Sequence, residues 1–319
     1  MSTSPNKLPV ELQAPDIRPW RQGNTGVDWV HRWTGAQRGQ KVMVQALTHG
    51  NEICGAIALD WLFKSGWKPL RGELVLAFGN VAAYERFNPA DPFPSRLVDE
   101  DYNRVWGDDQ LFSDRDSVEL RRARQLQPFV DAAEQLLDIH SMSEPCAALM
   151  VCGTVDKNAA YSRLLGVPEY LLIDTGHPAG LRMVERGGFG DPLSARHAVL
   201  IECGQHWEKA AAEVAIDCLV RFLGLTGLAD AAWVAANTRL PLPRQQKLVR
   251  VTEAVVARSH DFRFLMPTHG LQVVPKAGTP LAQDGSHVWL TPYDDCVLVM
   301  PGTHNLKPGG TAVRLGRFE

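Results

Sequence analysis

Short apolar runs alternate with helix-like stretches over the first three quarters of the chain. Residues 42–47 and 73–78 are mostly apolar and predict buried strands. Between them, residues 56–63 place apolar side chains three and four positions apart, which predicts a helix. A further buried strand is predicted over 198–201 and a helix over 208–223. Strands that alternate with helices favour an α/β domain whose central sheet is mixed, largely parallel and flanked by helices.

The middle of this region departs from the pattern. Residues 88–116 are rich in Pro, Asp and Arg and show no clear periodicity. A loop of that length inside a compact domain is more often functional than idle. Residues 117–137 then predict one helix, or two helices broken at Pro128, leading into a strand that ends at 138–140.

The pattern of predicted elements changes near residue 240. Short β-like runs are separated by Gly, Pro and Asp turns, and we expect no helix among them: 247–256, 270–274, 287–290, 296–300 and 311–315. We therefore predict a catalytic domain over 1–238 and a small C-terminal all-β domain over 239–319, joined near 237–244.

Composition and charge exclude several classes of protein. Hydrophobic residues make up 45% of the 319 positions and charged residues 22%, which excludes intrinsic disorder. The net charge of −3 argues against nucleic acid as the main partner. We expect no membrane association, because no apolar stretch approaches 18 residues and the N-terminus lacks a signal-like core. Six scattered cysteines without a CxxC pair suit reduced thiols and a cytoplasmic location.

The strongest local signal is the pentapeptide Thr48-His49-Gly50-Asn51-Glu52, which follows a predicted strand and begins a predicted helix. A His and a Glu three positions apart at such a junction can aim an imidazole and a carboxylate at one point, and zinc accepts both ligand types. We expect Gly50 to allow a sharp turn there. In the alternative interpretation His49 caps the helix and Glu52 is a first-turn acid favoured by the helix dipole.

Two further polar groups lie where predicted strands end. Asp138 and His140 are two positions apart and therefore point to the same face of a strand, so the carboxylate could orient the imidazole behind a metal site. Glu202 follows an apolar strand. Burying a carboxylate there is costly unless it has a catalytic role or an ion-pair partner such as an arginine. Together with His49 and Glu52, these residues predict an open zinc site with a neighbouring general base.

Four motifs in this order resemble those of the succinylglutamate desuccinylase/aspartoacylase family, which belongs with the zinc carboxypeptidases in fold and site. They are His49-Gly50-Asn51-Glu52, the segment RLVDEDYNR over 96–104, Asp138-Ile139-His140-Ser141 and Ile201-Glu202-Cys203-Gly204. The resemblance runs from about residue 42 to 202 and is weaker in the β-rich tail.

The resemblance implies roles for individual residues. One zinc ion per chain would be held by His49, Glu52 and His140. Glu202 would be the general acid and base that activates water, and Arg96 would polarise the scissile carbonyl. Asn103 and Arg104 would bind the α-carboxylate of the substrate; alternatively, Arg96 and Arg104 form ion pairs with Asp99 or Asp101.

The substrate's other groups are less well matched by the sequence. The arginine that binds an acidic side chain in aspartoacylases corresponds here to Arg186 or Arg196, or to neither. Tyr293 is a candidate for the C-terminal tyrosine that reaches that site. Which acyl group and amino acid are recognised therefore stays open.

These observations favour a zinc-dependent amidohydrolase that removes an acyl group, such as acetyl or succinyl, from a small N-acyl amino acid. A metallocarboxypeptidase that acts on short peptides or cell-wall fragments is the alternative enzyme, because the chemistry at the amide is the same. A non-catalytic scaffold that keeps the fold is the alternative from another class. The family resemblance makes a homodimer plausible.

Overall fold

The computed structural model describes residues 8–174, 176, 179–304 and 306–319. An eleven-stranded mixed sheet organises most of them, with the strand order β1-β3-β2-β4-β7-β5-β6-β8-β14-β13-β10. The first eight strands along the chain are β1 Val30–Thr34, β2 Gln37–Ala46, β3 Arg71–Phe78, β4 Gln135–Met142, β5 Leu149–Val151, β6 Tyr170–Ile173, β7 His197–Gln205 and β8 Lys247–Val256. Strands β3, β2, β4 and β7 are parallel neighbours, whereas β1 and β5 join them antiparallel.

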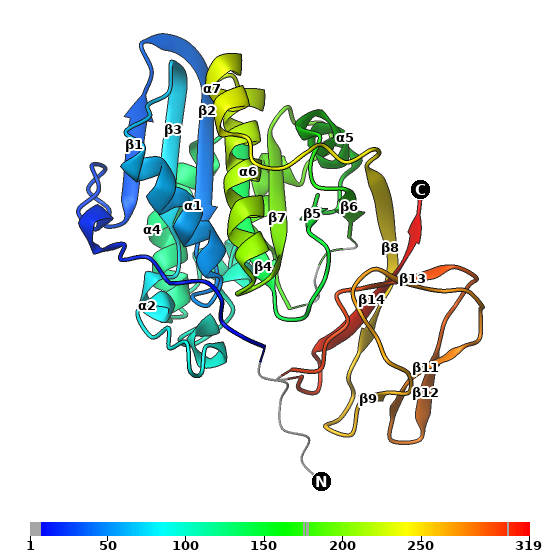
Figure 1. Cartoon of the computed structure of the whole chain (residues 1–319). Coiled ribbons are helices and arrows are strands. Elements are labelled where there is room, and N and C mark those ends of the chain that lie inside the picture. Colours follow the sequence, from blue (N-terminus) through cyan, green and yellow to red (C-terminus); the bar gives the residue numbers. More distant parts are fainter. Residues whose placement is uncertain (1–7, 175, 177–178, 305) are drawn as a thin grey trace.

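Helices cover both faces of the sheet (Figure 1). The α-helices are α1 Ile53–Lys64, α2 Val81–Tyr84, α3 Asp108–Leu111, α4 Val118–Ala132, α5 Asp156–Leu165, α6 Lys209–Leu225 and α7 Ala231–Asn237. Short 3₁₀ turns lie at Arg18–Trp20, Phe93–Arg96, Tyr102–Arg104, Met183–Glu185 and Gly187–Phe189. The prediction of an α/β fold with a largely parallel central sheet is confirmed.

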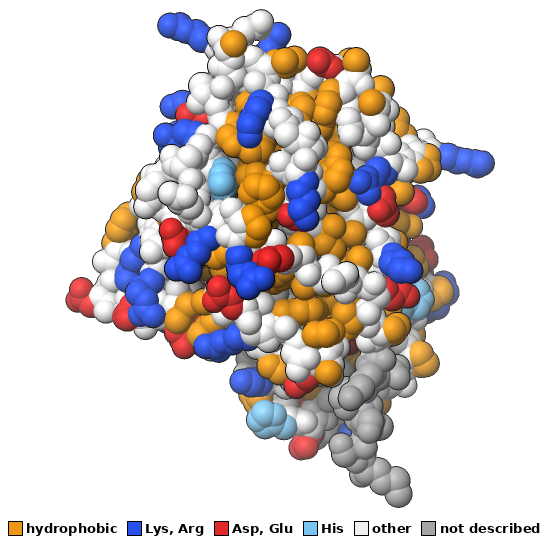
Figure 2. Space-filling model, turned by 60° about the vertical axis from the view of Figure 1, so that its left-hand side comes forward, with side chains coloured by type: hydrophobic (Ala, Val, Ile, Leu, Met, Phe, Trp, Pro, Cys, Tyr) orange, Lys and Arg blue, Asp and Glu red, His pale blue; other side chains and the backbone are white. Residues whose placement is uncertain are grey.

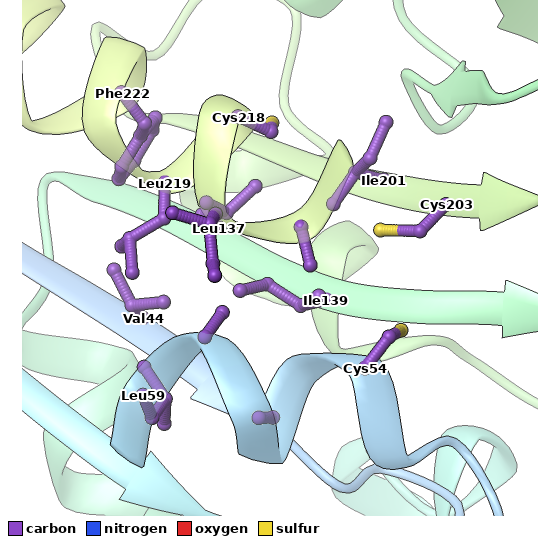
Figure 3. Packing of buried hydrophobic residues seen from close by; sticks show 14 of the residues in the cluster. Val44, Cys54, Leu59, Leu137, Ile139, Ile201, Cys203, Cys218, Leu219 and Phe222 are labelled. Atoms are coloured by element: carbon purple, nitrogen blue, oxygen red, sulfur yellow. The ribbon is translucent and has the colours of Figure 1, made fainter. Parts of the chain in front are cut away.

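Alternating side chains of the strands point into two separate cores. On β2, Val42 and Val44 pack with α1 and α6, whereas Met43 packs with α4 on the opposite face. This follows from the two-residue period of a strand. Figure 3 shows the first core, in which Leu219 and Phe222 of α6 and Leu59 of α1 meet the strands. Because parallel strands covered on both faces bury every side chain, their sequences are continuous apolar runs, as found here.

The predicted helix over 117–137 is wrong at its C-terminal end. One helix, α4, accommodates Pro128 and ends at Ala132. Ala133 is extended, and the backbone N–H of Glu134 already donates to the carbonyl of Lys41 on the neighbouring strand (2.8 Å). Strand β4 then starts at Gln135, because pairing with β2 and β7 outweighs the local preference for helix.

The main sheet continues into the C-terminal region. Strand β8 pairs parallel with β6, and β14 (Thr311–Phe318), β13 (Cys296–Val299) and β10 (Gln272–Val274) extend the sheet from it. A small antiparallel sheet contains β9 Arg263–Phe264, β11 Pro280–Asp284 and β12 His287–Leu290. The region is all-β among its described residues, as predicted. The domain boundary at 238/239 stays a prediction, and hydrogen bonds of the sheet cross it.

The outer surface agrees with a nearly balanced charge. On the face in Figure 2, Lys and Arg side chains are interspersed with Asp and Glu and share the surface with hydrophobic groups. Within the described residues, no helix combines the length and apolar character that a membrane span requires. All six cysteines are free thiols, and five of them are buried.

Candidate metal centre

Three predicted metal ligands converge where β2 and β4 end. After Ala46, Leu47 adopts a left-handed conformation (φ 60°), and the chain turns through His49 to Glu52, which precedes α1. His49 Nδ1 lies 2.7 Å from Glu52 Oε1, and His140 Nδ1 lies 2.9 Å from Glu52 Oε2. Ligand atoms of His49, Glu52 and His140 all lie within 4.8 Å of one another, and all three residues are buried. This donor set has the size and chemistry of a metal site.

A carboxylate supports the second nitrogen of each imidazole. Asp138 Oδ2 lies 2.7 Å from His140 Nε2, and Asp101 Oδ1 lies 2.9 Å from His49 Nε2. Such contacts fix the ring orientation and leave both Nδ1 atoms to face the same point. Burial opposes charge on His140, but Asp138 and Glu52 outweigh it and raise its pKa well above the ordinary value. The arrangement therefore gathers two imidazoles and a carboxylate around one centre of negative potential, which suits a divalent cation.

Gly50 is required by a close approach rather than by the turn that the sequence suggested. A Cβ atom there would lie 2.4 Å from the carbonyl oxygen of Ser95 and from the backbone nitrogen of Tyr84. The Gly50 N–H donates to the carbonyl of Arg96 (3.1 Å). Glycine thus lets the long loop over 88–116 lie directly against the ligand loop, which brings Arg96 to the metal centre.

Arg96 and Glu202 line the same cavity as the three candidate ligands. Arg96 contacts Glu52 Oε1 and Asp101 Oδ2, each at 3.4 Å. Glu202 extends from β7 opposite His140 in the strand register, and no described residue forms a hydrogen bond with its buried Oε2. Burial raises the pKa of the Glu202 carboxyl to about 8, although His140 and Arg96 oppose the shift. A carboxyl with such a pKa can both accept and return a proton near neutral pH.

A cavity of about 760 Å³ opens above these groups. The predicted site residues that line it are His49, Glu52, Arg96, Asn103, Arg104, His140 and Glu202. Asp138 lies behind it, fully buried, where its second oxygen accepts a hydrogen bond from Thr48 Oγ1 (2.8 Å). The ion-pair alternative fits Arg96, which contacts Asp101, but Arg104 donates to the carbonyl of its neighbour Asn103 (2.6 Å).

Three predicted candidates lie elsewhere. Arg196 donates to the backbone carbonyl of Asp131 (2.6 Å), and Arg186 forms ion pairs with Asp131 and Asp108. The Tyr293 hydroxyl is hydrogen-bonded to Thr252 Oγ1 (2.6 Å), under the guanidinium of Arg317. None of the three lines the cavity, because partners outside it already hold their polar groups.

Sequence reasoning missed other groups at the site. Arg182 and Arg314 line the cavity, and Asp101 supports His49. Asp101 could have been found, because it precedes Asn103 by two positions in a motif already recognised and mirrors the role expected of Asp138. Arg314 lies in the β-rich region, 110 positions beyond the last motif, and no local signal marks it.

Comparison with known proteins agrees with this geometry. The family model described as the succinylglutamate desuccinylase/aspartoacylase catalytic domain matches residues 38–208. That range contains all three converging ligands and Glu202. A search of the curated proteins finds no match to this chain.

Solved structures of similar fold cover nearly the whole chain. Succinylglutamate desuccinylase from Vibrio cholerae is 16% identical with a TM-score of 0.67, covering 91% of this chain and 86% of that chain. The succinylglutamate desuccinylase/aspartoacylase from Rhodobacter sphaeroides is 15% identical, with a TM-score of 0.64 and coverages of 91% and 88%. A product-bound ectoine utilization protein from Ruegeria pomeroyi is 14% identical, with a TM-score of 0.61 and 92% coverage of both chains. The structural matches show the shared fold, and because the family model spans more than half of the sequence, the chain belongs to the succinylglutamate desuccinylase/aspartoacylase family.

Proposed function

We propose that this protein is a zinc-dependent amidohydrolase that removes the acyl group from a small N-acyl amino acid. The observation that carries the proposal is the buried His49, Glu52 and His140 donor set, which shares one cavity with Glu202 and Arg104. Two imidazoles and one carboxylate are the ligands that catalytic zinc takes in many hydrolases. Each imidazole also has the carboxylate support that such ligands need.

When bound, zinc would supply Lewis-acid polarisation of the scissile carbonyl and make water a stronger acid. Side chains of the protein carry out the proton transfers and stabilise the developing charge. Glu202, whose Oε2 has no competing partner among the described residues, takes a proton from the attacking water and returns it to the leaving amine. Arg96 places its guanidinium beside the same centre, where it stabilises the negative charge that develops on the carbonyl oxygen.

Arg104 and Asn103 bind the carboxylate of the amino acid and so fix the amide relative to Glu202. A guanidinium presents parallel N–H donors that match a carboxylate. Asn103 is held in place because its Oδ1 accepts a hydrogen bond from the backbone N–H of Met183 (3.3 Å). Holding the substrate at a fixed distance from the base removes much of the entropic barrier to reaction.

The test combines metal analysis with activity measurements. We expect about one zinc ion per chain, and hydrolysis of N-acetyl amino acids in preference to short peptides. The Glu202→Gln variant should bind zinc as the wild type does but lose activity by a factor of ~10²–10⁴. Glu213→Gln is the matched control, since Glu213 is a partly exposed acid on α6 that pairs with Arg239.

Each outcome bears on a different part of the proposal. A stable protein without metal would favour the scaffold alternative. Faster cleavage of peptides would favour the carboxypeptidase. An active Glu202→Gln variant would remove Glu202 from its role.

A further inference from the structure

Arg104 differs from the other guanidiniums that line the cavity. No ion pair joins it to an acid in the part of the chain that the structure describes, and its NH1 donates only to the carbonyl of Asn103. Arg96, Arg182 and Arg314 all lie close enough to repel its charge. Burial, reinforced by these neighbours against the attraction of Asp101, lowers the pKa of Arg104 to about 10. An anion that enters the cavity is therefore attracted most strongly to Arg104.

The guanidiniums of Arg182 and Arg314 already have acidic partners. Arg182 NH1 lies 2.9 Å from Asp174 Oδ2, and its NH2 pairs with Glu185. Arg314 Nε lies 3.1 Å from the same Asp174 oxygen. At most 12% of any of these four side chains is exposed, so water screens their charges weakly. Among the described residues of this cluster, the two cations and the two carboxylates balance, and a substrate carboxylate placed here would be repelled by Asp174 and Glu185.

Arg96 is compensated in the same way by Glu52 and Asp101. The remaining cation of the lining, Lys307, is exposed at the rim, as is the acid Glu144. Exposed charges are hydrated and contribute little to selectivity. Within the described lining, Arg104 is thus the one partly buried guanidinium that no ion pair joins to an acid.

Much of the remaining wall is apolar. Met142, Val151 and Leu200 line the cavity and belong to the core on the α4 side of the sheet, and Met300 packs against that core. A charged group against this wall would lose its hydration without gaining a partner, which is costly. An uncharged group loses little and buries apolar surface.

We propose that the substrate of this enzyme carries a single carboxylate, bound by Arg104, and that both its acyl group and its side chain are uncharged. The inference rests on the proposed function and narrows it. N-acetyl derivatives of neutral amino acids fit this description, whereas substrates with a second carboxylate, such as succinyl or aspartyl compounds, do not. Specificity is then determined by a cluster of ion-paired side chains that attracts no second carboxylate, because its charges cancel: Arg182, Arg314, Asp174 and Glu185.

The experiment compares substrates of equal shape and different charge. N-acetyl-L-leucine has the branched outline of N-acetyl-L-aspartate without its second charge. On the zinc-loaded enzyme we expect kcat/KM to be on the order of 100-fold higher for the leucine compound. N-acetyl-L-leucine should likewise exceed N-succinyl-L-leucine. Equal or faster turnover of either dicarboxylate overturns the inference.

A substitution tests the charge balance itself. Glu185→Gln removes one of the two carboxylates, so the leucine-to-aspartate ratio of kcat/KM should fall at least about tenfold. Asp174→Asn should lower it too and serves if the first variant does not fold. The control Glu213→Gln should leave the ratio unchanged. An unchanged ratio in a folded Glu185→Gln or Asp174→Asn enzyme overturns the assignment.

Binding measurements separate this inference from the proposed function. Calorimetric titration of the zinc-loaded Glu202→Gln protein reports affinity without turnover. If no compound is hydrolysed by the wild type, the proposed function fails, and the order of affinities still decides the inference. Tighter binding of N-acetyl-L-leucine supports it; tighter binding of N-acetyl-L-aspartate, or no binding of either compound, overturns it.

Discussion

Asp138 provides a sharp test of the proposed metal site. Its carboxylate is fully buried and lies 2.7 Å from His140 Nε2, while its other oxygen accepts from Thr48 Oγ1. The Asp138→Asn substitution keeps the size and removes the charge. No other described contact of Asp138 replaces the lost negative charge. Its second partner, Thr48, is uncharged and accepts a hydrogen bond from Gln45 Nε2 (2.8 Å), which is also uncharged.

The expected loss follows from this burial. Removing a carboxylate that supports a ligating imidazole typically lowers metal affinity 10- to 100-fold. Because no water reaches Asp138, we expect the upper end, about 100-fold, which corresponds to about 3 kcal/mol. Asp101 supports His49 in the same way, but 26% of its side chain is exposed. Solvent can replace part of its effect, so Asp101→Asn should cost only about tenfold.

The assay is a competitive zinc titration of the demetallated protein against a chromophoric chelator. Asp60→Asn is the matched control: Asp60 is also a buried acid with two partners, Trp20 and Lys64, but it lies on α1 away from the ligands. Its zinc affinity should equal that of the wild type. A folded Asp138→Asn protein within twofold of wild-type affinity would refute the support role. A larger loss for Asp101→Asn than for Asp138→Asn would refute the argument from burial.

Two further predictions concern stability. Burial lowers the pKa of His206 to about 3, so between pH 6.5 and 3 the unfolded state binds the extra proton and the wild type loses stability as the pH falls. Denaturant unfolding at pH 7 and pH 5 should therefore show a loss smaller by about 2 kcal/mol in His206→Gln than in the wild type, and equal losses would contradict the shift. Leu219 is fully buried between α6 and the sheet (Figure 3), so Leu219→Ala should cost about 2–5 kcal/mol. The exposed Leu193→Ala should stay within about 0.5 kcal/mol, and a similar small effect at Leu219 would contradict the packing.

Much of the site could be predicted because its signals are local. His49 and Glu52 lie three positions apart, and Asp138 and His140 two, at points where apolar strands end. The carboxyl ends of parallel strands meet at one edge of a sheet, so short patterns distant in sequence become neighbours in space. The fold class followed from the same periodicities, since the central strands β2, β3, β4 and β7 contribute side chains to cores on both faces of the sheet.

The arginines show where such reasoning stops. Arg186 and Arg196 are as plausible by spacing as Arg182, but Asp131 holds both of them outside the cavity through its carboxylate and its backbone carbonyl. Arg182 enters the lining because Asp174 and Glu185 fix it there. Ion pairs between distant segments decide these positions, and no periodicity in the sequence encodes them.

The C-terminal region also has a larger role than its sequence indicated. Short β-like runs after residue 240 read as a separate unit, yet β8 continues the main sheet from β6, and β14 lies beside β8. That register places Arg314 next to Asp174, which directly follows β6. The residues that would bind the metal lie in the N-terminal half of the sequence, whereas Arg314, which pairs with Asp174 at the cavity, lies near the C-terminus. A residue on β14 therefore contributes to the charge at the cavity, although the ligand motifs, which end at Gly204, carry no information about it.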